Sequence, residues 1–395
     1  MSGSPQTAVW KNIGKYTTFG MALFAMFFGS GNIVFPIFVG VNAGSQFWAA
    51  YAGLVLTAVC LPLFGLVSLS LYDGKLKAFF GRVGALPSWF LIAVIFLLAG
   101  PIGVMPRCIL ISFGSLQRVF PGLELFWFAL GSVVVIYVLC LRPSRVIEVV
   151  GRVLTPVLLM TLLMMVFSSF WGEVQPVQVI PSKSWLDAVG FGFAQGYNTM
   201  DLFGAFVFAD IAMSGARQIF PTATANMQVL IRTYMRASIL GLGLLALVYL
   251  GVGMVGVRYA HLLTEERLDQ LLSLTALYTM GRYGEVLVSV LVGLACLTTV
   301  ISLTVSFSRF VCEEVLAAKL GYPWVLLGAL CVTFVACQFD FAPVQRFISQ
   351  VLELLMPALI VITVCNFLHK RFHFSMVKTP FWLTLFLTLL CKGYL

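Results

Sequence analysis

Two stretches of this sequence place polar and small residues in the middle of long apolar runs. In the first, Gly29-Ser30-Gly31-Asn32 interrupts a run that extends from about residue 17 to 40. Glycine has no Cβ, so a ligand can approach the backbone closely at such a point. A helix broken here would offer free N–H groups to a carboxylate and free carbonyl groups to an ammonium or sodium ion. Small residues are also common where two helices pack tightly, and this stretch taken alone supports both interpretations equally.

The second stretch, Gln195–Asp201, interrupts the sixth apolar run and includes an acidic residue. A charged group near the bilayer midplane costs about 3 kcal/mol on insertion scales and usually marks a transport pathway or a buried pair. Asp201 could therefore face a substrate amine, a coupling ion or a neighbouring polar side chain. The first and sixth runs begin two successive five-helix groups, and an odd number of helices inverts the second group. Matching interruptions in two inverted halves indicate a transporter binding site, which favours ligand binding for both stretches.

A third group of polar side chains lies in the eighth apolar run, at Ala295–Thr304. Hydroxyl oxygens there could replace part of the water around a small cation. Ser and Thr in membrane helices often bond only to their own backbone, so the pattern by itself favours a structural role for any one of them. No cluster of His, Cys or carboxylate side chains has a spacing suited to catalysis or metal binding, so we expect neither an enzyme nor a cofactor.

The composition indicates that a membrane surrounds these elements. Of the 395 residues, 61% are apolar and only 10% are charged, and the mean hydropathy is +1.02. A soluble domain has about 25% charged residues. Apolar runs of about 20 residues recur along the chain and predict an all-α integral membrane protein with about eleven transmembrane helices. We expect them near residues 17–40, 46–71, 88–111, 124–141, 146–171, 186–213, 227–256, 284–310, 323–338, 347–368 and 379–395.

The same runs divide the chain into parts. Residues 1–16 are expected to form a cytoplasmic tail, 17–368 a ten-helix transporter core, and 369–395 a basic loop with an eleventh helix. The core divides into one repeat near 17–171 and a second near 186–368. An internal N-terminus places 16 of the 24 Lys and Arg residues on the cytoplasmic side, as the positive-inside rule requires. The net charge of +9 then reflects orientation, and it requires no nucleic acid partner.

Two features are expected on the external side. Arg107 lies near the end of the third span and counts among the external basic residues. The segment 264–278 begins with Thr264 and two acidic residues, followed by apolar residues three and four apart. This pattern predicts an amphipathic helix that lies on the membrane domain, and an inert cap is favoured over a lid.

Three motifs resemble those of the branched-chain amino acid:cation symporter family, a bacterial group in the amino acid–polyamine–cation superfamily. They are Phe27–Pro36, Gly196–Asp201 and Leu294–Thr299, and similar character extends from about residue 20 to 369. The first two are fairly specific in combination, and the third is weak alone. The resemblance implies a leucine-transporter-like fold, with five helices repeated in inverted order and helices 1 and 6 broken. It also implies import of leucine, isoleucine and valine across the inner membrane by alternating access, driven by a sodium or proton gradient.

The resemblance to this family also implies which residues would bind the substrate and the ion. The first break would hold the substrate carboxylate and the second would complete the pocket, and together they comprise Phe28, Gly29, Ser30, Gly31, Asn32, Gln195, Gly196, Tyr197, Asn198, Thr199 and Asp201. A sodium ion would lie between carbonyl groups of the first helix and oxygen atoms of the eighth, contributed by Ala25, Phe28, Ala295, Thr298 and Thr299. The substrate side chain would pack among residues such as Phe27, Phe28 and Phe203.

The chain departs from the family pattern in two ways. Ser30 stands where family members usually have Ala, which is a small change. About eleven spans are predicted where twelve are usual, and this leaves oligomer contacts open. Two other functions remain as alternatives: a passive channel or facilitator, and a symporter for another apolar amino acid such as methionine. One aliphatic side chain exchanged for another changes binding by only ~1–3 kcal/mol, so the sequence does not separate these substrates.

Overall fold

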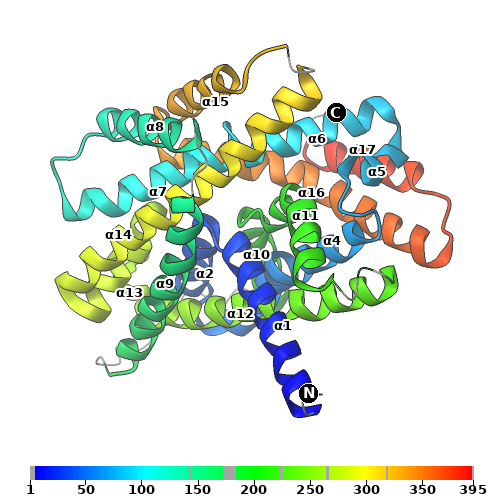
Figure 1. The fold of residues 1–395 in the computed structure, drawn as a ribbon. Coiled ribbons are helices and arrows are strands. Elements are labelled where there is room, and N and C mark those ends of the chain that lie inside the picture. Colours follow the sequence, from blue (N-terminus) through cyan, green and yellow to red (C-terminus); the bar gives the residue numbers. More distant parts are fainter. Residues whose placement is uncertain are drawn as a thin grey trace.

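The computed structural model describes residues 5–141, 145–171, 184–221, 224, 226–263, 267–316 and 319–393. Helices account for all the regular secondary structure in these ranges, and Figure 1 shows their arrangement. The first apolar run forms two helices, α1 (Pro5–Phe27) and α2 (Ser30–Ala43), and the sixth forms α10 (Trp185–Asn198) and α11 (Asp201–Ile219). The two halves of the sixth run are bent by about 40° at their break. Both predicted interruptions are therefore present.

The other elements follow the expected spans closely. The second span consists of α3 (Phe47–Val55), the π-helical turn η2 (Leu56–Cys60) and α4 (Leu61–Ser70). Later spans are α8 (Leu125–Leu141), α9 (Arg145–Trp171), α12 (Met227–Arg258), α14 (Leu271–Phe310), α15 (Tyr322–Cys337), α16 (Phe341–Phe372) and α17 (Lys378–Cys391). Short elements connect them: η1 (Gly44–Gln46), α5 (Leu76–Phe80), η3 (Gly81–Val83), α13 (Ala260–Leu263), η5 (Leu268–Gln270) and η6 (Val311–Val315). The predicted all-α architecture with about eleven spans is confirmed, and α1 extends back to Pro5 into the expected tail.

The third span differs from its prediction as one helix over 88–111. It is broken into α6 (Ala85–Ala99) and α7 (Val104–Val119), separated by Gly100–Gly103. Gly100 has φ −101° and ψ −129°, which is outside the helical region. Pro101 explains this conformation, because the residue before a proline is pushed away from helical angles and proline itself donates no hydrogen bond.

The extra length of the third span also corrects the position of Arg107. This residue lies in the first turn of α7 and is only 1% exposed, so it is buried within the span and is not one of the external basic residues that the sequence predicts. The error arose because the span continues to Val119, beyond the expected end near 111. Arg107 is near the end of the predicted span over 88–111, but it is near the middle of the longer, broken span formed by α6 and α7.

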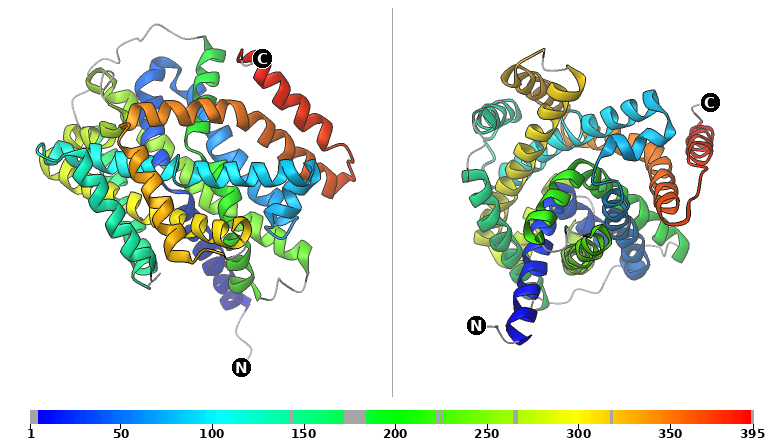
Figure 2. Two further views of the ribbon diagram at one scale, coloured as in Figure 1. Left: turned by 90° about the horizontal axis from the view of Figure 1, so that it is seen from above. Right: turned by 45° about the vertical axis from the view of Figure 1, so that its right-hand side comes forward.

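The helices form two groups that face each other across the broken segments (Figures 1 and 2). In the first group, which we call the bundle, α1 and α2 pack on α12, α3 packs on α10, and α4 packs on α11. In the second group, which we call the scaffold, α7 and α9 pack on α14, and α8 packs on α15. Contacts of α2 with α14 and α7 join the two groups. The breaks of the first and sixth spans therefore lie where bundle and scaffold meet.

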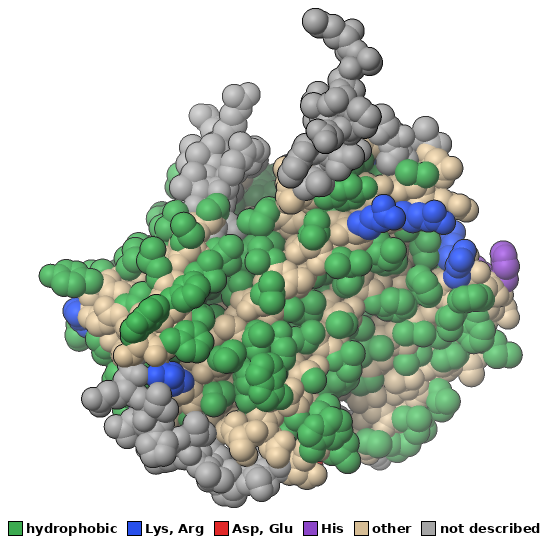
Figure 3. Space-filling model, turned by 90° about the horizontal axis from the view of Figure 1, so that it is seen from below, with side chains coloured by type: hydrophobic (Ala, Val, Ile, Leu, Met, Phe, Trp, Pro, Cys, Tyr) green, Lys and Arg blue, Asp and Glu red, His purple; other side chains and the backbone are tan. Residues whose placement is uncertain are grey.

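Much of the outer surface is apolar. Large side chains such as Trp48, Trp127 and Trp324 are each more than 60% exposed. In the view of Figure 3, hydrophobic side chains cover most of the face, and the Lys and Arg side chains lie toward its margins. Exposing such a surface to water is unfavourable, whereas contact with lipid chains is not. The surface thus fits a multi-pass membrane protein.

The predicted amphipathic helix is the first part of α14, which begins at Leu271 and has a non-helical residue at Gly281 (φ 73°). Leu271, Leu272 and Thr275 are buried against the membrane domain, as the spacing predicted. Thr264 and the two acidic residues after it lie outside the described residues. The segment before the helix is anchored by Arg267, whose guanidinium bonds the carboxylate of Asp269 at 3.0 Å.

Candidate functional site

The first break exposes the start of α2. Gly29 has extended backbone angles (φ −117°, ψ −168°), and its N–H donates to Asn32 Oδ1 at 3.0 Å. In a continuous helix the Gly29 N–H would donate to the carbonyl of Ala25, and here it donates to the Asn32 side chain instead. A Cβ built at Gly31 would lie 3.0 Å from both the Cα and the carbonyl oxygen of Thr199. The two breaks therefore lie against each other, and only glycine fits here without displacement of the neighbours.

The second break contains a single left-handed residue. Met200 has φ 62° and ψ 22°, and α11 begins at the next residue, Asp201. Non-glycine residues adopt this conformation infrequently, and their strain often accompanies functional sites. The turn ends α10 at Asn198 and starts a new helix at once, so a carbonyl end and an N–H end lie close together at the same depth.

Asp201 joins both breaks to a third helix. Asn32 Nδ2 donates to Asp201 Oδ1 and Oδ2, both at 2.8 Å, and the Tyr249 hydroxyl on α12 donates to Oδ2 at 3.0 Å. Asn32 also contacts the Tyr249 hydroxyl directly. All three side chains are buried. Because each carboxylate oxygen is bonded, much of the cost of burying this acid is offset. Of the three surroundings considered for Asp201, the structure places polar side chains next to it.

A second polar cluster surrounds the end of α10. Asn198 Nδ2 donates to Gln195 Oε1 at 3.1 Å, and Asn198 Oδ1 accepts from Ser349 Oγ at 2.8 Å and from Gln345 Nε2 at 3.3 Å. Ser349 and Gln345 belong to α16, so this cluster ties the sixth span to the tenth. The sequence offered no signal for these two residues, because they lie about 150 positions away in a different span.

The remaining candidates of the sixth span have packing roles in this conformation. A Cβ at Gly196 would lie only 1.9 Å from Thr57 Oγ1, so this glycine permits close contact between α10 and the second span. The Tyr197 ring lies edge-on to Phe193 with centroids 4.9 Å apart. The Thr199 hydroxyl donates to the Gly196 carbonyl at 2.8 Å.

The eighth-span hydroxyls lie beside the first break. Thr298 Oγ1 and Thr299 Oγ1 both donate to the carbonyl of Ala295, at 2.9 and 3.0 Å. Each hydroxyl hydrogen is thus used, while the oxygen lone pairs point to no donor among the described bonds. A Cβ at Gly29 would lie 3.8 Å from Thr299 Oγ1, so α14 contacts the break directly. The carbonyl of Ala25 lacks the Gly29 N–H that a continuous helix would supply, because that donor bonds Asn32.

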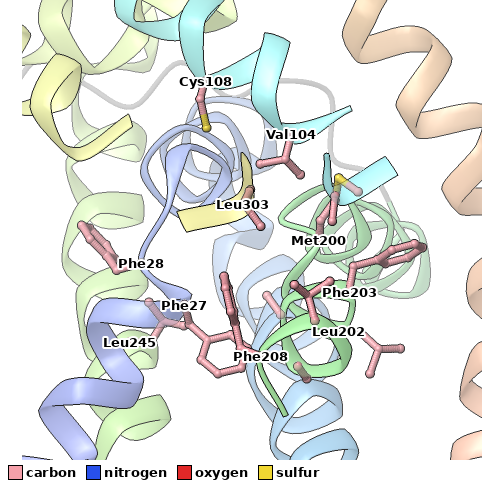
Figure 4. Packing of buried hydrophobic residues seen from close by; sticks show 14 of the residues in the cluster. Phe27, Phe28, Val104, Cys108, Met200, Leu202, Phe203, Phe208, Leu245 and Leu303 are labelled. Carbon is pink, nitrogen blue, oxygen red and sulfur yellow. The ribbon is translucent and has the colours of Figure 1, made fainter. Parts of the chain in front are cut away.

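The phenylalanines at the break are all buried, but they face different ways. Figure 4 shows Phe27 next to Phe208 of α11, whereas Phe28 points away from them. Phe27 also lies against Gly204, since a Cβ there would be 3.6 Å from its ring. Phe28 instead stacks on Phe24 with centroids 5.0 Å apart. Phe203 is fully buried in α11.

A cavity of about 1240 Å³ opens next to this region. Its walls come from α1, α5, α6, α11 and the end of α14, and they include Met26, Phe208 and Ser302. Met26 is in the last turn of α1, and Ser302 is one helical turn beyond Thr299. The cavity also reaches Lys75, which follows the second span, and Glu313, which follows the eighth span. An even number of crossings returns the chain to the side of its N-terminus, so the cavity opens on that side.

Arg107 faces the break from the scaffold. Its Nη1 donates to the carbonyl oxygen of Asn198 at 2.6 Å, and its guanidinium lies 5.8 Å from the Phe35 ring centroid. Its neighbour Cys108 donates from Sγ to Ser30 Oγ at 3.2 Å. Sequence reasoning missed this residue, and the available signal was Gly100-Pro101, which interrupts the third span just as glycines interrupt the first.

Comparisons with known proteins agree on the family and on the fold. The family model described as "Branched-chain amino acid transport protein" matches residues 13–393. A putative branched-chain amino acid carrier protein of Staphylococcus saprophyticus is 30% identical over 313 residues, covering 74% of this chain and 68% of that protein. The branched-chain amino acid permease BraB of Bacillus subtilis is 27% identical and covers 89% of this chain and 80% of its own length.

Solved structures of other proteins share this fold. An inward-facing conformation of Mhp1 matches with a TM-score of 0.65 at 16% identity, over 90% of this chain and 77% of that one. MhsT in complex with L-phenylalanine matches with a TM-score of 0.54 at 15% identity, over 94% of this chain and 97% of that one. At these identities the likeness concerns the fold alone, and it is the leucine-transporter fold that the broken first and sixth spans predicted.

Proposed function

The chain belongs to the branched-chain amino acid transport protein family, whose matched relatives are named as carriers and permeases and not as enzymes. From this premise we propose that it is a secondary-active symporter that imports leucine, isoleucine, valine or a related apolar amino acid. Import is coupled to a sodium ion or a proton and proceeds by alternating access. The protein resides in a bacterial inner membrane with its N-terminus in the cytoplasm.

One observation carries this proposal: the two broken spans meet, and the eighth span lies against them. Gly31 touches Thr199 across the breaks, and Gly29 lies beside Thr299. Helix ends with free N–H and carbonyl groups suit the two charges of a zwitterion. A backbone site of this kind recognises what all amino acids share, so the side-chain preference must come from the surrounding apolar residues.

The preference for an apolar side chain is supported by Phe27 and Phe208. Phe27 is buried beside Phe208 and against Gly204 of α11, and Phe208 lines the cavity. A hydrophobic pocket gains about 0.8 kcal/mol for each methylene group it buries. Charged amino acids would lose their hydration there without compensation, so they are excluded.

Sodium coupling is supported by the oxygen atoms near Thr299. We propose that the carbonyls of Ala25 and Phe28 bind the ion together with the hydroxyls of Thr298 and Thr299 and the carbonyl of Ala295. Both hydroxyls keep lone pairs free, because they act as donors to Ala295. Hard oxygen ligands of this type match sodium as well as calcium or magnesium, and the low total charge favours the monovalent ion.

Alternating access is supported by the large cavity on the N-terminal side. In this conformation the cavity reaches the last turn of α1 and the part of α14 just beyond Thr299. We propose that this is the cytoplasm-facing state, in which substrate and ion leave. Rotation of the bundle against the scaffold would close this route and open one on the external side.

The test is uptake into proteoliposomes of purified protein with independently imposed sodium and proton gradients. We expect labelled leucine to accumulate above its external concentration when the coupling gradient is present, and only to equilibrate without it. Equilibration under every gradient would instead show a facilitator. A competition panel of leucine, isoleucine, valine, methionine and alanine in the same vesicles identifies the substrate.

A further inference from the structure

We propose that Arg107 binds the carboxylate of the transported amino acid, so that the scaffold supplies the cationic half of the substrate site. This inference deepens the proposed function and rests on it. It assigns a direct binding role to a residue of the third span, beyond the backbone groups of the first and sixth spans.

The first argument is the position of the guanidinium. Nη2 of Arg107 lies 3.0 Å from where a Cβ of Gly31 would be, and Nη1 reaches the Asn198 carbonyl at 2.6 Å. The side chain therefore lies between the N-terminal end of α2 and the C-terminal end of α10. A carboxylate bound to the free N–H groups of α2 would be within reach of the same guanidinium.

The second argument is incomplete hydrogen bonding. Arg107 is only 1% exposed, and its Nε has no hydrogen-bond partner among the described residues. A guanidinium has five N–H donors in a fixed planar arrangement that matches a carboxylate. Burying a cation with one hydrogen bond to a carbonyl is costly, and such a group gains strongly when an anion arrives.

The third argument is the local electrostatics. Arg107 lies in the first turn of α7, and it faces the first turn of α2 at Gly31. Both helix N-termini carry partial positive charge, so a cation here is unfavourable and an anion is favoured. Asp201 is near enough to interact with the guanidinium, but its oxygen atoms are already bonded to Asn32 and Tyr249. Among the described residues the guanidinium therefore has no carboxylate in direct contact, although Asp201 balances its charge at a distance.

The combination explains selectivity for a zwitterion. An acid on the bundle and a base on the scaffold make the empty site neutral overall, and a zwitterion keeps it so. An amine without a carboxylate, such as leucinamide, would leave Arg107 unsatisfied and would meet two positive helix ends. We therefore expect the pocket to require the carboxylate more strongly than it requires any one side chain.

The experiment compares leucine with leucinamide in binding to purified, detergent-solubilised protein, which needs no ion gradient. Wild-type protein should bind leucine at least about 100-fold more tightly than leucinamide, as expected for a buried charged hydrogen bond. Arg107→Gln should weaken leucine binding by about 100-fold and bring the ratio close to one. Arg107→Lys keeps the charge and should restore part of the preference.

Arg118→Gln is the matched control. Arg118 lies on the same helix and donates from Nε to Glu285 Oε1 at 3.0 Å, away from the breaks. Its loss should lower thermal stability and leave the leucine-to-leucinamide ratio unchanged. A shift of that ratio in Arg118→Gln equal to that in Arg107→Gln would overturn the assignment, because any arginine loss would then have the same effect.

The outcomes separate this inference from the proposed function. If wild-type protein binds leucine and Arg107→Gln retains the wild-type ratio, Arg107 is not a carboxylate ligand. If wild-type protein neither binds nor accumulates leucine, the proposed function itself is wrong. If the Arg107 variants do not fold, the test uses wild-type protein in a competition assay. Equal competition by leucine, leucinamide and isopentylamine would refute a carboxylate site.

Discussion

The two faces of the broken helices differ in how completely their polar groups are paired. On the bundle face, Asp201 has both oxygens bonded to Asn32, and one of them also to Tyr249. On the scaffold face, and within the part of the chain that the structure describes, Arg107 has a buried nitrogen without a partner and Thr299 has unused oxygen lone pairs. A paired cluster holds geometry, whereas an unpaired group is available to a ligand. The comparison supports the proposal that the bundle holds the breaks in place and that the scaffold supplies groups for binding.

The largest effect should follow removal of the bundle cluster. Asp201→Ala leaves the Asn32 amide and the Tyr249 hydroxyl buried without their acceptor, and each buried donor left unsatisfied costs about 1–3 kcal/mol. We expect uptake of labelled leucine to be abolished while the protein still inserts in the membrane, as judged by size-exclusion chromatography. Wild-type uptake by this variant would remove Asp201 from the site.

The next effect tests the scaffold face. Thr299→Ala removes the hydroxyl closest to Gly29 and should raise the sodium concentration for half-maximal uptake by about tenfold, the equivalent of about 1.4 kcal/mol. Thr298→Ala should act in the same direction. Ser306→Ala is the matched control, since its hydroxyl donates to the Ser302 carbonyl in the same helix at 2.9 Å. Sodium dependence that is identical in all three variants and wild type would exclude the eighth-span ion site.

A smaller effect should distinguish packing from binding within the sixth span. Gly196→Ala places a methyl group against Thr57, whose hydroxyl donates to the Phe193 carbonyl at 2.9 Å. Overpacking of this kind costs about 1–3 kcal/mol. We expect a lower melting temperature with little change in leucine affinity for the folded fraction. A large loss of affinity at unchanged stability would show that Gly196 contacts the substrate.

The smallest effect should come from the contact between the two faces. Ser30 accepts a hydrogen bond from Cys108 Sγ at 3.2 Å, and thiols are weak donors. Ser30→Ala should therefore change leucine affinity less than about twofold, because a bond from a thiol is weaker than the about 0.5–1.5 kcal/mol of an ordinary hydrogen bond. An effect as large as that of Thr299→Ala would mean that the Ser30 hydroxyl itself binds substrate or ion.

Several parts of the site could be predicted because they depend on local sequence. Glycines within apolar runs indicate where backbone is exposed, and an acid in such a run indicates a buried polar contact. Asn32 and Asp201 were both identified in this way, as were the broken first and sixth spans. Their mutual hydrogen bond was not, because it joins residues 169 positions apart.

Other parts depend on distances that no local pattern contains. Gln345 and Ser349 look like ordinary polar residues of the tenth span, and only packing of α10 on α16 brings them to Asn198. Tyr249 is likewise an unremarkable residue of a long helix until α12 packs on α2. The sequence pattern shows the hydrophobic period of each helix, but it does not show which helix faces pack against each other.

The sequence by itself determined the membrane environment, the number of spans, their inverted order and the two central breaks. These follow from hydropathy and from the conformational freedom of glycine, which act locally. Only the tertiary structure decided the depth and the surroundings of Arg107. Its depth depends on the break at Gly100–Gly103, and its unpaired nitrogen depends on the packing of α7 against α2 and α10. What a buried charged residue can do depends on the residues around it, and the fold brings those residues together.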